Sequence, residues 1–314
     1  MFILAHFFVV LPVVGQSTKV AQEMGGVDLT GKVVFERSVE KSYPLSGSDR
    51  RLFVSNRFGA IRISTWDNPV VRVEALVRVG AENLVEAERY AQLIAVEGNG
   101  TGNRVEVRTV YPVGRPDESI GGYTVGLWIT APREIALVIE NRFGDCFVSD
   151  VAGDVALDVG YGVIGLTNIG GVARVRAKGE FPLQVSGLPK GGTFFLRSSQ
   201  AAFSGVGGTL TVNNYLGTVT IEKLLDKAQV VATCDNGPIH FTLPEGAAPY
   251  LQVTTEFGEI VSDVAMKGHT WGRTSTGVSG AEDSPQRVEL RSSFDSVYIH
   301  RQSLAPLVEA RDLK

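Results

Sequence analysis

The sequence contains few of the residues from which metal centres and catalytic sites are usually built. Among its 314 residues there are 4 histidines and 2 cysteines. No two histidines have the sequence spacing of zinc ligands. No phosphate-binding glycine motif of the GxxxxGK or GxGxxG type occurs between a strand and a helix. The sequence therefore predicts no catalytic residue, no metal site and no cofactor.

An excess of positive charge is also missing. The chain has 30 Lys and Arg against 34 Asp and Glu, with a net charge of −4. Proteins that bind nucleic acids or anionic membranes generally present clustered Lys and Arg. We therefore expect neither nucleic acid nor an anionic membrane surface as a partner.

Long apolar runs occur only at the beginning of the chain. Residues 1–15 are apolar apart from His6, and they fall short of the roughly 20 residues that span a bilayer. The run suits a secretory signal peptide cleaved before Gln16, although no Lys or Arg precedes it. A buried N-terminal strand is the alternative. We expect a signal peptide at 1–15, no integral membrane segment after cleavage, and an extracytoplasmic location in the periplasm, at the cell surface or outside the cell.

Glycine, in contrast, is abundant and marks a repeat. The 36 glycines separate short runs rich in Val, Ile, Leu and Phe, and they follow no collagen period. The segment LFVSNRFGAIRIS from Leu52 returns as LVIENRFGDCFVS from Leu137, and weaker copies follow. Successive turn positions lie 16 to 22 residues apart. A second kind of turn alternates with the first, so that each repeat holds two strands and two turns.

This pattern predicts an all-β, single-stranded β-solenoid resembling a parallel β-helix, with about two short strands per 16–22-residue rung. Alternation of side chains within strands assigns one inward column. Its expected members are Ile61, Cys146, Ile164, Phe181, Phe203, Val219, Ile239, Ile260 and Val297.

The register also predicts that both cysteines are free thiols. Cys146 falls in the inward column, whereas Cys234 takes the position of Asn56 and Asn141. About five rungs separate the two cysteines, which is about 24 Å at roughly 4.8 Å per rung. A disulfide requires Cα atoms within about 7 Å.

The expected organisation has four parts. A signal peptide at 1–15 precedes N-terminal strands at 28–112, with an amphipathic helix inserted at about 81–95 that would cover a sheet end. Solenoid repeats at 123–301 and a C-terminal tail at 302–314 follow. Stretches 112–122 and 268–286 are rich in Gly, Pro, Ser and Asp and are expected to be surface loops.

The order of these motifs carries a family resemblance. Leu-Phe-Val-Ser-Asn-Arg-Phe-Gly from Leu52 is followed by Ile-Arg-Ile-Ser-Thr-Trp-Asp-Asn from Ile61, the strand 71–74, the helix, and a second Asn-Arg-Phe-Gly at 141–144. This arrangement resembles a bacterial adhesin-like β-strand-repeat family of unknown function, whose members are often labelled auto-transporter adhesin head-like domains. The resemblance implies an extracytoplasmic β-helix with no established reaction. The turn at Gln200–Ala201, which lacks glycine, departs from the pattern.

Several polar residues that could form a site also have structural interpretations. β-Helix enzymes that cleave polysaccharides carry carboxylates on a solenoid wall, but Asp145, Asp150, Asp154 and Asp158 each fall at a turn or an outward position, where Asp favours local backbone bonding. The two Asn-Arg-Phe-Gly motifs are interpreted as structural turns, with Phe packed inward, Asn bound to turn backbone and Gly in a special torsion. Their residues are Asn56, Phe58, Gly59, Asn141, Phe143 and Gly144.

A binding surface is the remaining candidate. Outward positions between the column residues place aromatic and polar side chains on a solenoid wall, and exposed aromatics there can bind glycan or protein. The candidate ligand-binding residues are Arg62, Phe147, His240 and Tyr298. We expect an exported, non-enzymatic, adhesin-like binding module at the cell envelope, with a glycan or envelope protein as partner. A periplasmic scaffold or envelope-sensing partner is the alternative, followed by a carbohydrate-active β-helix enzyme.

Overall fold

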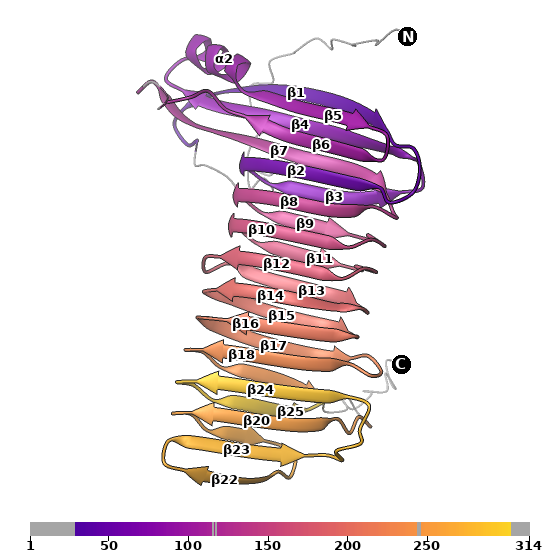
Figure 1. The fold of residues 1–314 in the computed structure, drawn as a ribbon. Helices are drawn as coiled ribbons and strands as arrows, with labels where there is room; N and C mark the ends of the chain where they lie inside the picture. Colours follow the sequence, from indigo (N-terminus) through magenta and orange to yellow (C-terminus); the bar gives the residue numbers. More distant parts are fainter. Residues whose placement is uncertain (1–28, 115, 117, 244–245, 303–314) are drawn as a thin grey trace, which may run out of the picture. The chain divides into compact units, whose positions relative to one another are not determined.

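The computed structural model describes residues 29–302, except 115, 117, 244 and 245 (Figure 1). The expected signal peptide at 1–15 and all but the first residue of the expected tail at 302–314 lie outside the described residues. The chain divides into two compact units, Met1–Leu183 (unit 1) and Gln184–Lys314 (unit 2). The described residues form strands and one helix, and the predicted β-solenoid fold is confirmed.

The regular rungs of unit 1 stack in parallel. In one sheet the neighbouring strands are β8 (Ala136–Phe143), β10 (Val155–Tyr161) and β12 (Ala173–Lys178). In the other sheet they are β9 (Cys146–Ser149) and β11 (Ile164–Thr167). Leu137 pairs with Val155, Val155 with Ala173, and Cys146 with Ile164, so that each rung advances by 18 residues. Alternate apolar side chains point inward and are buried.

The N-terminal strands of unit 1 extend both sheets in a less regular way. They are β1 (Val33–Pro44), β2 (Arg51–Phe58), β3 (Ile61–Trp66), β4 (Val70–Ala81), β5 (Ala95–Thr101), β6 (Arg104–Val110) and β7 (Ile120–Pro132). Strands β2 and β3 pair in parallel with β8 and β9. Strand β4 pairs antiparallel with both β1 and β7, and β5 pairs antiparallel with β6. The solenoid thus continues into an antiparallel N-terminal part, visible at the indigo end of Figure 1.

The inserted helix α2 spans Leu84–Leu93, inside the predicted range of about 81–95. Asn83 caps it, because its Oδ1 accepts a hydrogen bond from the Glu86 backbone N–H at 3.0 Å. Ala87, Tyr90 and Ala91 form the buried face against β1, β4 and β7. The helix therefore covers the end of the sheet in which β1 is the edge strand.

In unit 2 the first rungs follow chain order. Their strands, after β13 (Pro182–Leu188), are β14 (Gly191–Arg197), β15 (Ser199–Val206), β16 (Thr209–Asn214), β17 (Gly217–Leu224), β18 (Gln229–Asp235) and β19 (Ile239–Leu243). Leu210 pairs with Gly192 and with Val230, so the step grows from 18 to 20 residues.

The last rungs of unit 2 do not follow chain order. Strands β24 (Arg287–Ser293) and β25 (Val297–Arg301) lie between the rung of β18 and β19 and the rung of β20 (Tyr250–Glu256) and β21 (Ile260–Ser262). Val288 pairs with both Val230 and Leu251. The chain makes one rung, a hairpin, and then returns to fill the gap. The sequence pattern places Val297 after Ile260, whereas in the structure Val297 pairs with both Ile239 and Ile260.

That hairpin corrects the loop expected at 268–286. Strands β22 (Lys267–Trp271) and β23 (Thr274–Ser279) pair antiparallel, and β23 also pairs antiparallel with β20. Gly, Ser and Thr dominate this segment, which therefore lacks the apolar alternation that marks the other strands. The sequence pattern missed it because all five residues of β22 are exposed.

Two members of the inward column are also corrected. Phe181 is 43% exposed, and Leu183 and Val185 of β13 are buried. Phe203 is buried, but it pairs with Ile221, whereas Ala201 pairs with Val219. Phe181 precedes the first residue of β13, and Ala201 stands two residues before Phe203 on the same face of β15. The turns therefore place a different residue at the column position than the sequence pattern predicts.

Both cysteines are buried free thiols, as predicted. Burial raises the pKa of the Cys146 thiol to about 12. Burial is also the main cause that raises the pKa of Cys234 to about 12, with smaller contributions from the charges of Asp235 and Asp295. Cys146 therefore behaves as a small apolar group, whereas Cys234 Sγ also donates to Gly217 O at 3.4 Å.

A polar side chain lies inside each of several turns and binds a backbone carbonyl group there. Cys234 pairs with Asn214 and with Ser292, which places these three residues at one position of successive rungs in unit 2. In unit 1 the equivalent pair is Asn56 and Asn141. These buried side chains supply donors that the turn carbonyls would otherwise lack.

Candidate functional site

The two Asn-Arg-Phe-Gly motifs form neighbouring turns in unit 1. Asn141 Nδ2 donates to the carbonyl oxygens of Gly144 at 2.9 Å and Gly59 at 3.0 Å, and Asn56 Nδ2 donates to Gly59 O at 3.1 Å. Gly144 has φ +146°, and a Cβ there would lie 2.2 Å from Gly59 O. The asparagine and glycine residues of both motifs therefore stabilise the backbone of the turns.

The phenylalanines of these motifs do not pack inward as expected. Asn56 and Asn141 occupy the inner positions, whereas Phe143 is 39% exposed at the corner. Phe58, Phe143 and Tyr161 instead stack on successive rungs, with centroids 5.4 and 5.5 Å apart. The chain turns at these phenylalanines, so the inward and outward alternation of side chains along the strand no longer determines where their rings point.

Three of the four aspartates considered for catalysis connect successive rungs. Asp145 Oδ1 accepts from the backbone N–H of Val163 at 2.9 Å, and Asp154 Oδ1 accepts from that of Val172 at 2.9 Å. Asp150 Oδ1 accepts from the side-chain amide of Asn168. Asp158 is exposed on β10. The contacts of these carboxylates thus join turns on neighbouring rungs.

The four candidate ligand-binding residues fall into two separate groups. Arg62 and Phe147 are paired neighbours on β3 and β9 of unit 1. His240 and Tyr298 are paired neighbours on β19 and β25 of unit 2. Each group has its own surroundings, and we describe them in turn.

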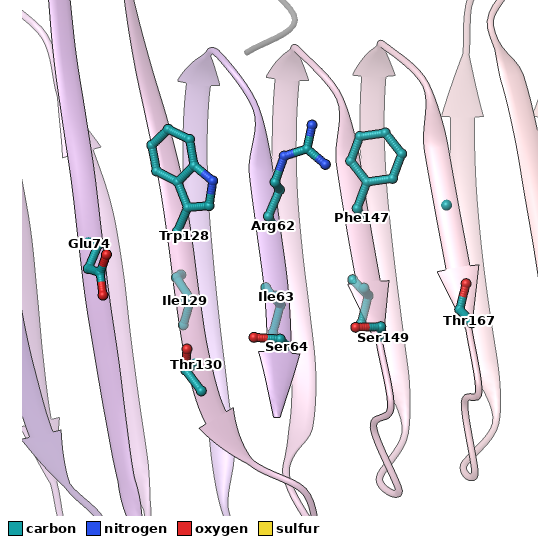
Figure 2. Close-up of a pocket in the computed structure, with 12 residues that line it drawn as sticks. Arg62, Ile63, Ser64, Glu74, Trp128, Ile129, Thr130, Phe147, Ser149 and Thr167 are labelled. Carbon is teal, nitrogen blue, oxygen red and sulfur yellow. The ribbon is translucent and has the colours of Figure 1, made fainter. Parts of the chain in front are cut away.

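In unit 1, Arg62 stands between two aromatic side chains (Figure 2). Arg62 pairs with Trp128 of β7 on one side and with Phe147 of β9 on the other. The guanidinium carbon of Arg62 lies 4.5 Å from the centroid of the Phe147 ring, which is a cation–π contact. The three side chains form a row across adjacent strands, which we call the Trp128 row.

The Trp128 row borders a shallow open groove of about 440 Å³. Beside the row, hydroxyl groups from four adjacent strands line the groove, and Glu74 of β4 stands at its end (Figure 2). The hydroxyl-bearing residues are Thr130, Ser64, Ser149 and Thr167. The groove thus combines aromatic rings, one guanidinium, one carboxylate and a line of hydroxyls.

Gly165 of β11 leaves space for the Phe147 ring. A Cβ at Gly165 would lie 2.7 Å from Phe147 Cδ1, closer than real Cβ contacts allow. The ring therefore extends over the next rung, and the absence of a side chain there shapes the groove. Neither Gly165 nor Trp128 was identified from the sequence. The strand register, which relates Trp128 to Arg62, would have been needed to find it.

In unit 2, His240 and Tyr298 lie beside a second histidine, His300. The rings of His240 and Tyr298 are stacked, with centroids 4.8 Å apart and planes 8° apart. His240 Nδ1 lies 3.4 Å from His300 Nε2. Burial is the main cause that lowers the pKa of His240; the charge of His300 lowers it further, and that of Asp295 opposes both.

Within the described residues, no cluster of three or more His, Cys, Asp and Glu side chains suits a metal ion. The one helix of the described residues, α2, lacks the length and apolarity needed to span a bilayer.

Comparisons with known proteins give distant structural likenesses. No family model matches the sequence, and no curated protein matches it. A crystal structure of a putative cell adhesion protein from Clostridium sporogenes covers 85% of this chain and 100% of its own, at 9% identity and a TM-score of 0.23. A putative adhesin from Bacteroides fragilis covers 85% of this chain and 97% of its own, at 11% identity and a TM-score of 0.35. Likenesses at this level support no argument about function.

Proposed function

We propose that this protein is an exported, non-enzymatic, adhesin-like binding module that recognises a carbohydrate in the groove beside the Trp128 row. The observation that carries the proposal is the row itself, in which two aromatic side chains flank Arg62 on one sheet surface. Export is supported by the apolar N-terminal residues, and the site by the geometry of unit 1.

The groove can contact both the apolar face and the hydroxyl-bearing edge of a sugar ring. One face of a pyranose ring carries C–H groups, which pack on aromatic rings, while its edge carries hydroxyls. Trp128 and Phe147 provide the aromatic surfaces, and Arg62, Glu74 and the hydroxyl line provide donors and acceptors. Aromatic surface with a few placed polar groups is typical of small-molecule sites.

The spacing of the aromatic residues favours an extended glycan over a single sugar. Trp128 and Phe147 stand two strands apart, because Arg62 pairs with both. Two strand spacings amount to about 9.6 Å. Neighbouring sugar units of one chain can therefore contact the two rings, whereas a single pyranose is too small to do so. The groove is open, which also suits an interior segment of a chain.

A glycan array probed with the full protein tests this proposal. We expect bound glycans whose signal falls by about tenfold or more in Trp128→Ala and Phe147→Ala, since each loses a stacking surface. Phe195→Ala, at an exposed aromatic residue of β14 in unit 2, is the matched control and should bind normally. Gly165→Ala is the sharper variant, because its methyl group must displace the Phe147 ring.

Two results would contradict the proposal. One is an array without any bound glycan, and the other is binding that the Trp128 and Phe147 variants leave unchanged. Location is tested separately by protease treatment of intact cells followed by fractionation. Cleavage on whole cells supports a surface adhesin, whereas protection until the envelope is opened favours a periplasmic scaffold.

A further inference from the structure

Two histidines that are 60 residues apart in sequence face each other in unit 2. His240 Nδ1 and His300 Nε2 are 3.4 Å apart, the ring centroids are 5.7 Å apart, and the planes differ by 9°. The centroid separation exceeds the nitrogen separation by 2.3 Å. That is about twice the distance from an imidazole centre to its nitrogen. The two nitrogens therefore lie on the line between the ring centres, and the rings share nearly one plane.

We propose that His240 and His300 form a two-histidine site for a late first-row transition-metal ion such as Zn²⁺ or Cu²⁺. Imidazole nitrogens bind zinc at about 2.0–2.1 Å, so two of them at a tetrahedral angle are about 3.3–3.4 Å apart. The observed separation of 3.4 Å matches this value without any movement of the strands. The lone pairs now lie close to the line between the two nitrogens, so each ring must turn about its side-chain bonds to direct its lone pair at a common point.

The backbone holds this pair in place. His240 belongs to β19 and His300 to β25, and these strands pair in parallel, with Thr242 opposite His300. Tyr298 stacks against His240 and limits the rotation of that ring. His300 is exposed, so an ion can enter from solvent, and water would complete its coordination.

The position of the pair gives the ion a structural consequence. Strand β25 belongs to the rung that returns out of chain order to lie between β19 and β21. An ion held by both histidines would join this returning rung to the earlier one, across 60 residues of sequence. Because the two ligands meet only in the folded chain, the ion binds the native state and stabilises it.

Titration of the full-length, untagged protein with ZnCl₂ tests the proposal. Calorimetry should show one Zn²⁺ bound per chain in the native protein, and this binding should be lost in His300→Ala and in His240→Ala. In thermal unfolding, Zn²⁺ should raise the midpoint of the native protein by a few degrees, reversibly with EDTA. His269→Ala, at an exposed histidine of β22, is the matched control and should keep both responses.

His300 is exposed, so its replacement by alanine should leave the fold intact. Circular dichroism without metal verifies that both variants fold. Loss of the ion equivalent and of the thermal shift in both variants supports the site. Equal zinc responses in the native protein and in His300→Ala overturn it, and so does the absence of binding in the native protein. CuCl₂ serves as a second probe, for which the same dependence on both histidines is expected.

Discussion

The regular rungs of unit 1 and the final rungs of unit 2 differ in which residue takes positive φ at the corner between the two sheets. In unit 1, Gly144 and Gly162 have φ of +146° and +148°, and a Cβ on either would lie 2.2 Å from a carbonyl oxygen of the preceding rung. In unit 2, the non-glycine residues Phe257 and Phe294 take φ of +64° and +65° near the corresponding corner. Close approach of successive backbones, rather than positive φ alone, is what makes glycine necessary.

The largest expected effect concerns that close approach. Gly144→Ala should cost several kcal/mol of unfolding free energy, about 3 or more, because strain in φ adds to a contact with fixed backbone. Gly272→Ala, with φ +62° and nothing within 4 Å of its Cβ, should cost only about 1 kcal/mol. Urea denaturation measures both. Equal losses would show that positive φ alone decides the requirement.

The polar residues inside the turns should show a smaller difference in unfolding free energy between the two units. Asn141→Ala removes a donor to the carbonyls of Gly59 and Gly144 and should cost about 2 kcal/mol. Cys234→Ala in unit 2 removes only a weak thiol contact to Gly217 O and should cost about 1 kcal/mol. The measurement is again urea denaturation. A loss for Cys234→Ala as large as that for Asn141→Ala would contradict this ranking.

The exposed aromatic stacks should contribute less. Phe257 and Phe294 stack at 4.9 Å with planes 10° apart, and both are exposed. Replacing either by alanine should cost about 0.5–1.5 kcal/mol, and the double variant should cost less than the sum. A double-mutant cycle measured by thermal unfolding supplies the coupling energy. Strict additivity would mean that the stack contributes nothing beyond its separate rings.

The thiols should show no measurable reaction in the folded protein. Burial raises the pKa of both Cys146 and Cys234 to about 12, so the reactive thiolate is scarce at pH 8. A chromogenic thiol reagent should label neither residue in the native protein and both in urea. Rapid labelling of one thiol in buffer would indicate local opening of its unit.

Local features of the fold were predictable from the sequence, and pairings between distant segments were not. The Asn-Arg-Phe-Gly corners, the buried column and the helix depend on residues close in sequence. They were identified with errors in the direction of Phe58 and Phe143 and in the column positions of Phe181 and Phe203. The partners of the candidate residues depend on register. Arg62 was named without Trp128, which stands beside it, and His240 without His300.

The sequence by itself indicated the solenoid, because two alternating kinds of turn and one side-chain register recur over many repeats, which a meander of hairpins would not readily give. It also indicated that the cysteines stay unpaired, since about five rungs separate them and a disulfide cannot span that distance. The tertiary structure decided the order of the last rungs and the composition of both candidate sites. Parallel strands of similar pattern can pair in more than one order, and only the hairpin of β22 and β23 and the returning chain select the one that brings His300 to His240.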